Sequence, residues 1–386
     1  MNIGFLTSEY PHNITGSSGG IGTSIKNLAN AFTELNHQVT VYVIGQAVDN
    51  EFSDGPIKIV QIKNVKFKGL SWFLTRKKIQ KIINEHVVER NLDIVEAHDW
   101  TGLTAFMKLK CYLLIKLHGS DAYFCHLEKR PVKLWNYFLE KKALGSADAH
   151  ISVSTFTAKT TNKIFKQNLE YKIIPNGIRL PEQKAFDRQI DEIQLNQKIL
   201  YVGTLIRKKG VLELPLIFNE LIKLNKSAEL IIAGNDTLDI KTGSKSTWDL
   251  MKSLFSPEAL KRVFYSGRVP YERIEEIYRT ADVCVFPSYA EAFPVSWLEA
   301  MAMGKAVVAS DIGWAHEVID DGISGILCSP ADHKKFASNI ADVLSDSKLR
   351  IYLGDNARSR VEKNFSAEII AEKTIDFYKS VIDHRE

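Results

Sequence analysis

The sequence predicts an α/β protein made of two doubly wound domains, each built on a parallel sheet. Its 386 residues correspond to two or three domains at ~150 residues per domain. Short, near-continuous apolar runs alternate with amphipathic helical stretches, which is the pattern of buried parallel strands and their crossover helices. After a polar segment near the middle of the chain the same alternation starts again, so we expect two domains of similar size.

The first domain, residues 1–178, opens with a strand–helix–strand unit. The apolar runs 1–7 and 38–44 enclose a glycine-rich loop and a helical pattern that carries Ile25 and Leu28. Parallel strands require such a crossover between them. Further strands of this domain are predicted at 57–62, 93–97, 112–117 and 149–153.

The second domain, residues 198–365, follows a linker at 179–197 that is polar and lacks periodicity. Its first strand, 198–204, leads to a helix that starts near Gly210. Ligands of open α/β sheets bind at the carboxyl ends of the strands. We therefore expect the site in a cleft where these ends of two Rossmann-like domains face each other. The remaining elements are strands at 229–233, 263–265, 283–287 and 306–309 and helices at 271–280 and 294–303.

Composition excludes several classes of protein. Hydrophobic residues at 45% and charged residues at 25% are typical of globular domains and exclude disorder, collagen and coiled coil. A net charge of +4 is too small for a dedicated nucleic-acid binder. The chain starts without the pattern of a secretory signal, and it has no apolar run of the ~18 residues that span a bilayer. Its four scattered cysteines indicate reduced thiols in a cytoplasmic protein.

The most informative segment is 287–304, where a strand ends, a loop follows and a helix begins. Glu291 lies in the loop, Pro294 fits the first helical turn, and Glu299 lies about five residues into the helix. Each carboxylate can accept hydrogen bonds from neighbouring sugar hydroxyls. The amides near residues 292–295, together with the helix dipole, suit a diphosphate.

These residues resemble the donor-site signature of retaining glycosyltransferase family 4, which has the GT-B fold. The matching pattern is Glu-x7-Glu, continued by Ala-Met-Ala-x-Gly-Lys-Ala-Val-Val-Ala-Ser up to Ser310. The resemblance covers nearly the whole chain, although Ala292 stands where the family usually has glycine and Thr204 where many members have arginine. The other matching segments, in order, are Gly-Gly (19–20), Leu-His-Gly (117–119), Ile-Pro-Asn-Gly (174–177), Val-Gly-x5-Lys-Gly (202–210) and Ala-Asp-Val-x-Val-x-Pro-Ser (281–288).

The resemblance implies a role for each matching position. Glu291 would contact donor-sugar hydroxyls, Glu299 the nucleotide ribose, and Lys209 the diphosphate. The Gly20 amide would approach a phosphate oxygen, and His118 would face the sugar at the reacting centre. The terminal helix, within 366–386, would pack back onto the first domain. The resulting candidates are, for catalysis, His118, Lys209 and Glu291, and, for donor binding, Gly20, Arg207, Lys209, Glu291, Phe293, Pro294, Val295 and Glu299.

Several candidates also fit structural explanations. Lys209 follows two other basic residues, as a solvated helix start would, and a lone histidine such as His118 is often a structural one. Arg207 is included on the hypothesis that it replaces the charge that Thr204 lacks. His98 and Asp99 follow a predicted strand, and together with Asp121 they are further acceptor-side candidates.

The expected reaction needs no metal or other cofactor. The chain contains no Asp-x-Asp motif, so cationic side chains and helix amides would stabilise the charge that grows on the leaving diphosphate. The resemblance implies transfer with retention, from a UDP- or GDP-type donor to a saccharide or lipid-linked acceptor in polysaccharide biosynthesis. The alternatives are a nucleotide-sugar epimerase of similar fold and a non-catalytic binder of sugar nucleotides. A dinucleotide dehydrogenase is disfavoured because Ile25 replaces the third glycine of Gly-x-Gly-x-x-Gly.

A basic segment at 58–81 holds eight lysines and arginines and no acid, with Trp72, Phe73 and Leu74 inside it. Basic charge interleaved with exposed aromatics attracts proteins to anionic membranes. The segment therefore predicts peripheral contact with the inner face of the cell membrane. The alternative is a solvated helix whose apolar residues face the core.

Overall fold

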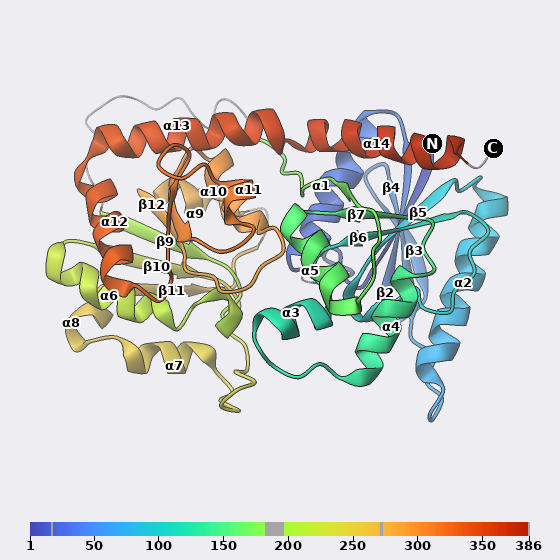
Figure 1. Ribbon diagram of the computed structural model, residues 1–386, viewed down its shortest axis with the longest axis horizontal. Helices are drawn as coiled ribbons and strands as arrows, with labels where there is room; N and C mark the ends of the chain where they lie inside the picture. Colours follow the sequence, from blue (N-terminus) through green and yellow to red (C-terminus); the bar gives the residue numbers. More distant parts are fainter. Residues whose placement is uncertain (17, 182–196, 271–272, 385–386) are drawn as a thin grey trace. The chain divides into compact units, whose positions relative to one another are not determined.

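Two sheets carry the fold, one in each of two units of the chain. The computed structural model describes residues 1–16, 18–181, 197–270 and 273–384. Unit 1 consists of Met1–Arg179 with Phe365–Glu386, and unit 2 of Leu180–Asn364. Most of the predicted linker, 182–196, lies outside the described residues, as do the first two residues of the helix predicted at 271–280. The predicted α/β class is confirmed (Figure 1).

Unit 1 contains an eight-stranded sheet in the order β3-β4-β2-β1-β5-β6-β7-β8. All neighbouring strands are parallel except β3 and β4. The strands are β1 (Asn2–Thr7), β2 (Gln38–Gln46), β3 (Asn50–Asp54), β4 (Ile57–Lys63), β5 (Ile94–His98), β6 (Tyr112–Leu117), β7 (Ala149–Ser152) and β8 (Lys172–Ile173). The helices are α1 (Gly20–Glu34), α2 (Ser71–Glu89), η1 (Trp100–Gly102), α3 (Asp121–Leu127), α4 (Leu134–Leu144), α5 (Thr155–Phe165) and α14 (Ala367–Asp383).

The antiparallel strand β3, at one edge of this sheet, was not predicted from the sequence. Its sequence, Asn-Glu-Phe-Ser-Asp, is polar and mostly exposed, because an edge strand of a sheet is not covered like the central ones. Hydrophobic periodicity cannot detect such a strand. The signal for it is the dipeptide Asp54-Gly55, since Gly55 has φ +58° and Asp-Gly favours a tight hairpin turn.

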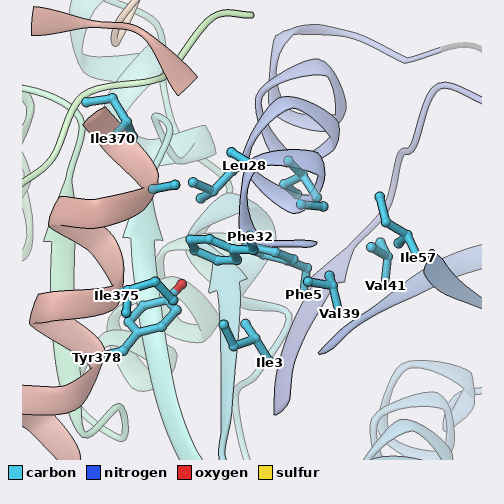
Figure 2. Packing of buried hydrophobic residues seen from close by; sticks show 14 of the residues in the cluster. Ile3, Phe5, Leu28, Phe32, Val39, Val41, Ile57, Ile370, Ile375 and Tyr378 are labelled. Atoms are coloured by element: carbon cyan, nitrogen blue, oxygen red, sulfur yellow. The ribbon is translucent and has the colours of Figure 1, made fainter. Parts of the chain in front are cut away.

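The helix α14 completes the core of unit 1, although it is the last element of the chain. Figure 2 shows Ile370, Ile375 and Tyr378 lying against side chains of α1 and the sheet. The Tyr378 ring lies 6.0 Å from that of Phe32, and the Tyr378 hydroxyl donates to the buried carboxylate of Glu96 at 2.7 Å. The apolar face of α14 is therefore built into the first sheet's core.

The Ile-Pro-Asn-Gly segment at 174–177 joins α1 to α14. Asn176 accepts a hydrogen bond from the Ser24 hydroxyl at 2.9 Å, and the Gly177 carbonyl accepts one from the Asn27 side chain at 3.3 Å. A Cβ on Gly177 would lie 3.1 Å from the Cα of Ala367. This motif is thus explained by close packing between elements of unit 1.

Unit 2 contains a six-stranded parallel sheet in the order β11-β10-β9-β12-β13-β14. In chain order this is 3-2-1-4-5-6, the strand order of doubly wound nucleotide-binding folds, whose direction reverses between β9 and β12. The strands are β9 (Lys198–Val202), β10 (Glu229–Ala233), β11 (Val263–Gly267), β12 (Val283–Phe286), β13 (Ala306–Ser310) and β14 (Ile326–Cys328). The helices are η3 (Arg207–Lys209), α6 (Glu213–Leu224), α7 (Thr247–Leu254), α8 (Pro257–Leu260), α9 (Ile274–Thr280), α10 (Val295–Ala302), α11 (Ala315–Val318), α12 (His333–Ser345) and α13 (Ser347–Asn364).

Two helix starts in unit 2 differ from the prediction. The helix expected near Gly210 begins at Glu213, because Gly210 adopts a left-handed conformation with φ +64° and ends the short turn η3. Pro294 is the N-cap of α10, with ψ 115°, and does not belong to its first turn. Both differences place more of the candidate residues in loops at the carboxyl edge of the sheet.

Candidate functional site

The loops that follow β9 and β12 bring two predicted catalytic residues together. Lys209 lies at the end of η3, and its Nζ is 3.1 Å from Oε1 of Glu291. Both side chains are partly buried. Because β9 and β12 flank the point where the strand order reverses, this ion pair lies where open α/β sheets bind their ligands.

Glycine makes this approach of the two loops sterically feasible. The Lys208 carbonyl accepts hydrogen bonds from the amides of Tyr289 and Ala290, at 2.7 and 3.0 Å. A Cβ on Gly210 would lie 1.7 Å from the carbonyl oxygen of Pro287. The residue that follows Lys209 must therefore be glycine for the loops to meet in this way.

Glu299, the fifth residue of α10, adds a second carboxylate near the same lysine. Its Oε2 accepts a hydrogen bond from the Tyr278 hydroxyl at 3.0 Å. Desolvation in these crowded surroundings raises the pKa of Glu299 to about 7, although the Tyr278 hydrogen bond and the positive charge of Lys209 partly oppose this. The three predicted residues Lys209, Glu291 and Glu299 thus belong to one cluster in unit 2.

The start of α10 is the predicted anion site. Phe293, Pro294 and Val295 are buried in unit 2, and no side chain caps the helix at Pro294. Helix starts attract anions because of the helix dipole. Ala292, which replaces the usual glycine, is also buried.

Arg207 is directed to a different partner from Lys209. Its Nε and a terminal nitrogen contact both carboxylate oxygens of Asp239, at 2.6 and 2.9 Å. The Thr242 amide and hydroxyl donate to the same carboxylate, and these bonds to Arg207 and Thr242 hold the pKa of Asp239 below its usual range despite its burial. The predicted contact between Arg207 and a diphosphate is not tested by this pairing.

Tyr201, in β9, is a buried tyrosine on which the charge of Glu291 acts. Its hydroxyl donates to the Thr204 carbonyl at 3.4 Å, and desolvation and the charge of Glu291 raise its pKa well above the usual value. Sequence reasoning missed Tyr201, Tyr278 and Asp239. Tyr201 alone carried a signal, as a polar group near the end of an apolar strand.

In unit 1, His118 and Gly119 follow β6 directly. The pKa of His118 lies far below its usual value because the side chain is buried and because the charges of Lys116 and His98 oppose its protonation. The imidazole is therefore neutral at pH 7. The His118 amide donates to Oδ1 of the buried Asp99 at 2.9 Å. Burial raises the pKa of Asp99 to about 7 and lowers that of His98 to about 4.

A buried glutamate fixes the loops around His118. Glu140, on α4, accepts hydrogen bonds from the amides of Thr101, Asp121 and Ala122 at 2.9 to 3.1 Å. Asp121 itself accepts from Asn136 and Arg130. Sequence reasoning missed Glu140, and it named Asp121, the first residue of α3, as an acceptor-side candidate.

The glycine-rich loop of unit 1 already holds a carboxylate. Gly20 is the first residue of α1, and the amides of Gly19 and Gly22 both donate to Glu9, each at 3.0 Å. Glu9 follows β1 by two residues, and sequence reasoning missed it. Its position marks the amides of this loop as a place that accepts negative charge.

In the described part of the chain, no group of three or more histidine, cysteine, aspartate or glutamate side chains is arranged to hold a metal ion. None of the helices described is both long enough and apolar enough to cross a bilayer.

Comparison with known proteins identifies both halves of the chain. The family "Glycosyltransferase Family 4" matches residues 18–181, and the family "Glycosyl transferases group 1" matches residues 182–360. An uncharacterized glycosyltransferase of Methanocaldococcus jannaschii is 25% identical, over 99% of each chain. The capsular polysaccharide biosynthesis glycosyltransferase CapM of Staphylococcus aureus is 26% identical over 86% of this chain and 94% of that protein. The alpha-maltose-1-phosphate synthase of Mycolicibacterium smegmatis is 25% identical, covering 99% of this chain and 100% of that protein.

Solved structures share the fold. Sucrose-phosphate synthase from Thermosynechococcus elongatus superimposes with a TM-score of 0.79 at 20% identity, covering 99% of both chains. HepE of Anabaena, in complex with UDP-glucose, superimposes with a TM-score of 0.72 at 18% identity, covering 98% of this chain and all of that one. The chain belongs to the glycosyltransferases, as a GT-B enzyme with a family 4 domain followed by a group 1 domain.

Proposed function

We propose that the protein transfers a sugar, with retention of anomeric configuration, from a UDP- or GDP-type donor to a saccharide or lipid-linked acceptor. The observation that carries this proposal is the cluster of Lys209, Glu291 and Glu299 at the point where the unit 2 sheet reverses. One cation between two acids suits a ligand with an anionic diphosphate and many hydroxyls. The binding of UDP-glucose by HepE of Anabaena supports a nucleotide-sugar donor.

In this proposal Lys209 stabilises the charge that develops on the leaving diphosphate. The diphosphate would replace Glu291 as the partner of Lys209, which frees the Glu291 carboxylate to accept hydrogen bonds from sugar hydroxyls. Glu299 would accept from the ribose, and the start of α10 would add its dipole. A positioned donor of this kind contributes about 3–4 kcal/mol to transition-state stabilisation. The proposal includes a reaction without a metal. The charge of Lys209 and the dipole of α10 support this part of it.

Unit 1 would supply the acceptor side and close the site. A neutral His118 imidazole can exchange hydrogen bonds with a sugar hydroxyl without adding charge. The Gly20 amide would approach a phosphate oxygen. We likewise propose that the carboxyl edges of the two sheets face each other across a cleft. The segment 58–81 would contact an anionic membrane, where a lipid-linked acceptor is presented.

A thermal-shift panel of nucleotide sugars tests the donor. A donor at 100 times its dissociation constant stabilises the protein by ~2.7 kcal/mol, and EDTA should leave this shift unchanged. Glu291→Gln should reduce it, whereas Glu275→Gln, an equivalent change in a half-exposed surface ion pair, should not. Absence of a shift with every UDP and GDP sugar would contradict the proposal.

Product analysis separates the alternatives. Transfer requires an acceptor, and proton NMR of the product should show the anomeric configuration of the donor. Conversion of the donor to another sugar nucleotide without acceptor would identify an epimerase instead. Donor binding that leads to no reaction with any saccharide or lipid-linked acceptor would favour a non-catalytic binder.

A further inference from the structure

The basic segment 58–81 of unit 1 contains both buried and exposed side chains. Trp72, Phe73 and Leu74 are only partly exposed, and Arg76 is buried, where it donates to the carbonyls of Trp72 and Gly102. The part of the segment before α2 is exposed instead: Phe67 is 57% exposed and Leu70 48%, with Lys66 and Lys68 on either side of Phe67. The exposed apolar side chains near it come partly from a second segment of the chain, at the start of α4.

That second segment completes an aromatic cluster. Trp135 packs edge-on against Trp72, with ring centroids 5.1 Å apart, and stacks on Phe138 at 5.6 Å. Phe106 lies 6.0 Å from both Trp72 and Phe138. Large parts of this cluster face solvent: Trp135 is 49% exposed, Phe138 47%, and the adjacent Leu134 84%. Figure 1 shows α2 and α4 starting on the same, lower side of unit 1.

A surface hollow continues from this aromatic cluster. It has a volume of about 620 Å³, and Phe73, Phe106 and Lys77 line it. Two further lysines, Lys108 and Lys142, line the same hollow. Lys77 Nζ lies 5.6 Å from the centre of the Phe73 ring, so the wall of the hollow holds a cationic group close to an aromatic one.

The charge of this face is strongly positive. Asp148 is the acid that lines the hollow, and it is engaged by the Leu113 amide at 2.8 Å. The nearby acids Glu128 and Asp121 both contact Arg130. Exposed basic residues are neighbours in sequence of the exposed apolar ones in both segments: Lys66 and Lys68 adjoin Phe67, and Lys133 adjoins Leu134. Aromatic and aliphatic side chains within such a basic field favour an anionic lipid surface.

We infer that this face of unit 1 docks on an anionic phospholipid bilayer, with Leu134, Trp135 and Phe138 entering the interface and the hollow between Lys77, Lys108 and Lys142 receiving a lipid phosphate. The inference deepens the proposed function, because it states where the acceptor's membrane is met. Only the identity of the acceptor in this inference rests on the proposed function. The docking itself follows from the exposure, the hollow and the charge.

Vesicle flotation tests the surface as a whole. The full chain should float with vesicles of phosphatidylglycerol and phosphatidylcholine at low salt, and not with phosphatidylcholine alone. Lys77→Gln/Lys108→Gln/Lys142→Gln should bind roughly a hundredfold more weakly, from the attraction of each lysine to an anionic surface. The matched control, Lys226→Gln/Lys261→Gln/Lys334→Gln, removes three exposed lysines from unit 2 and should bind like the wild type.

Fluorescence tests the apolar contact. Vesicles should shift tryptophan emission to the blue in the wild type, and Trp135→Phe should lose most of that shift while it keeps its affinity. We call Lys77→Gln/Lys108→Gln/Lys142→Gln the hollow variant. The inference would be overturned if the protein did not float with anionic vesicles, or if the hollow variant and its control lost vesicle binding equally. A dimer in solution that Trp135→Ser/Phe138→Ser dissociates would also overturn it, because a second copy would then be the occupant.

The donor experiment keeps the two proposals apart. The hollow variant retains Lys209, Glu291 and Glu299, so its thermal shift with the nucleotide sugar should equal that of the wild type. A normal donor shift with no vesicle binding would reject the docking surface alone. Vesicle binding without any donor shift would reject the proposed donor alone.

Discussion

Lys209 is the residue on which the site depends most, because it pairs with Glu291 and its charge also acts on Glu299. Replacing it with alanine should lower kcat about a hundredfold to a thousandfold, since removal of one preorganised donor costs that much in comparable sites. Steady-state kinetics with saturating donor measure this. Lys223→Ala, which removes a lysine of an exposed ion pair, is the control. A kcat equal to that of the wild type would exclude Lys209 from the chemistry.

Glu299 should make the stability of the protein depend on pH near neutrality. Because its pKa is raised from 4.5 to about 7, the native state holds a proton that the unfolded chain has lost between these values. The free energy of unfolding must therefore fall as pH rises through this range. Glu299→Gln imitates the protonated acid. Between about pH 5 and pH 8 its free energy of unfolding should therefore depend less steeply on pH than that of the wild type.

Urea unfolding of both proteins across this range is the measurement. Asp99 and Glu140 also have pKa values raised to about 7 by burial, and they act in the same direction in both proteins. Only the difference between wild type and variant reports on Glu299. Parallel pH curves would show that its carboxyl group titrates in the native state as it does in the unfolded chain.

Which single residues could be predicted depended on how local their signal was. Lys209, Glu291 and Glu299 lie in a loop–helix pattern that sequence spacing reveals. Asp239 holds Arg207, which is 32 residues away, and Glu140 holds loop residues near His118 that are 18 to 39 residues away. Their roles arise only when distant loops meet, so local sequence carries no trace of them.

At the scale of the element, the turn from η3 to α6 determines where Lys209 lies. Gly210 has φ +64°, and its hydrogen atoms face the Pro287 carbonyl, where a Cβ would lie 1.7 Å from the oxygen. Gly210→Ala should therefore destabilise unit 2 by clearly more than the ~1 kcal/mol that a left-handed alanine costs. It should also weaken donor binding, and it should lower kcat about a hundredfold, because a displacement of ~1 Å has that effect on catalysis.

Gly243→Ala separates backbone strain from steric clash. Gly243 has a similar positive φ of +74°, but no atom lies within 4 Å of the position of its Cβ. This variant should cost only about 1 kcal/mol and should bind the donor normally. Equal effects of both substitutions, measured by urea unfolding and by donor titration, would mean that contact with Pro287 is unimportant.

Elements were predictable where burial imposed a pattern. The buried strands β6 and β10 have the predicted bounds, because apolar runs mark strands covered on both faces. The polar edge strand β3 and the turn η3 lack such a pattern. The helix starts at Glu213 and Val295 differ from the prediction because a glycine and a proline act there through backbone geometry, which hydrophobic periodicity does not register.

At the scale of the whole molecule, the alternation of strands and helices predicted two sheets but not the order of their strands. Order depends on which side each crossover takes, and residues distant in sequence decide this by packing. In unit 2 the resulting order brings β9 beside β12, so that the loops carrying Lys209 and Glu291 become neighbours. The contact between Lys209 and Glu291 is thus a property of topology, although both residues stand out in the sequence.

The core of unit 1 depends on the final helix, α14, because residues after 364 complete a core that begins at residue 3. Ile370, Ile375 and Tyr378 are almost completely buried, and burial of such side chains is worth about 1.5–3 kcal/mol each. Their sum is comparable with the ~5–15 kcal/mol that stabilises a typical domain. A chain ending at Asn364 should therefore lose amide-exchange protection in β1 and β5 while β10 keeps its own.

Tyr378→Phe, which deletes only the hydrogen bond to Glu96, should destabilise unit 1 by about 1–3 kcal/mol without unfolding it. Hydrogen–deuterium exchange resolved by strand measures both, and full protection of β1 in the shortened chain would show that α14 only covers a core that is already stable.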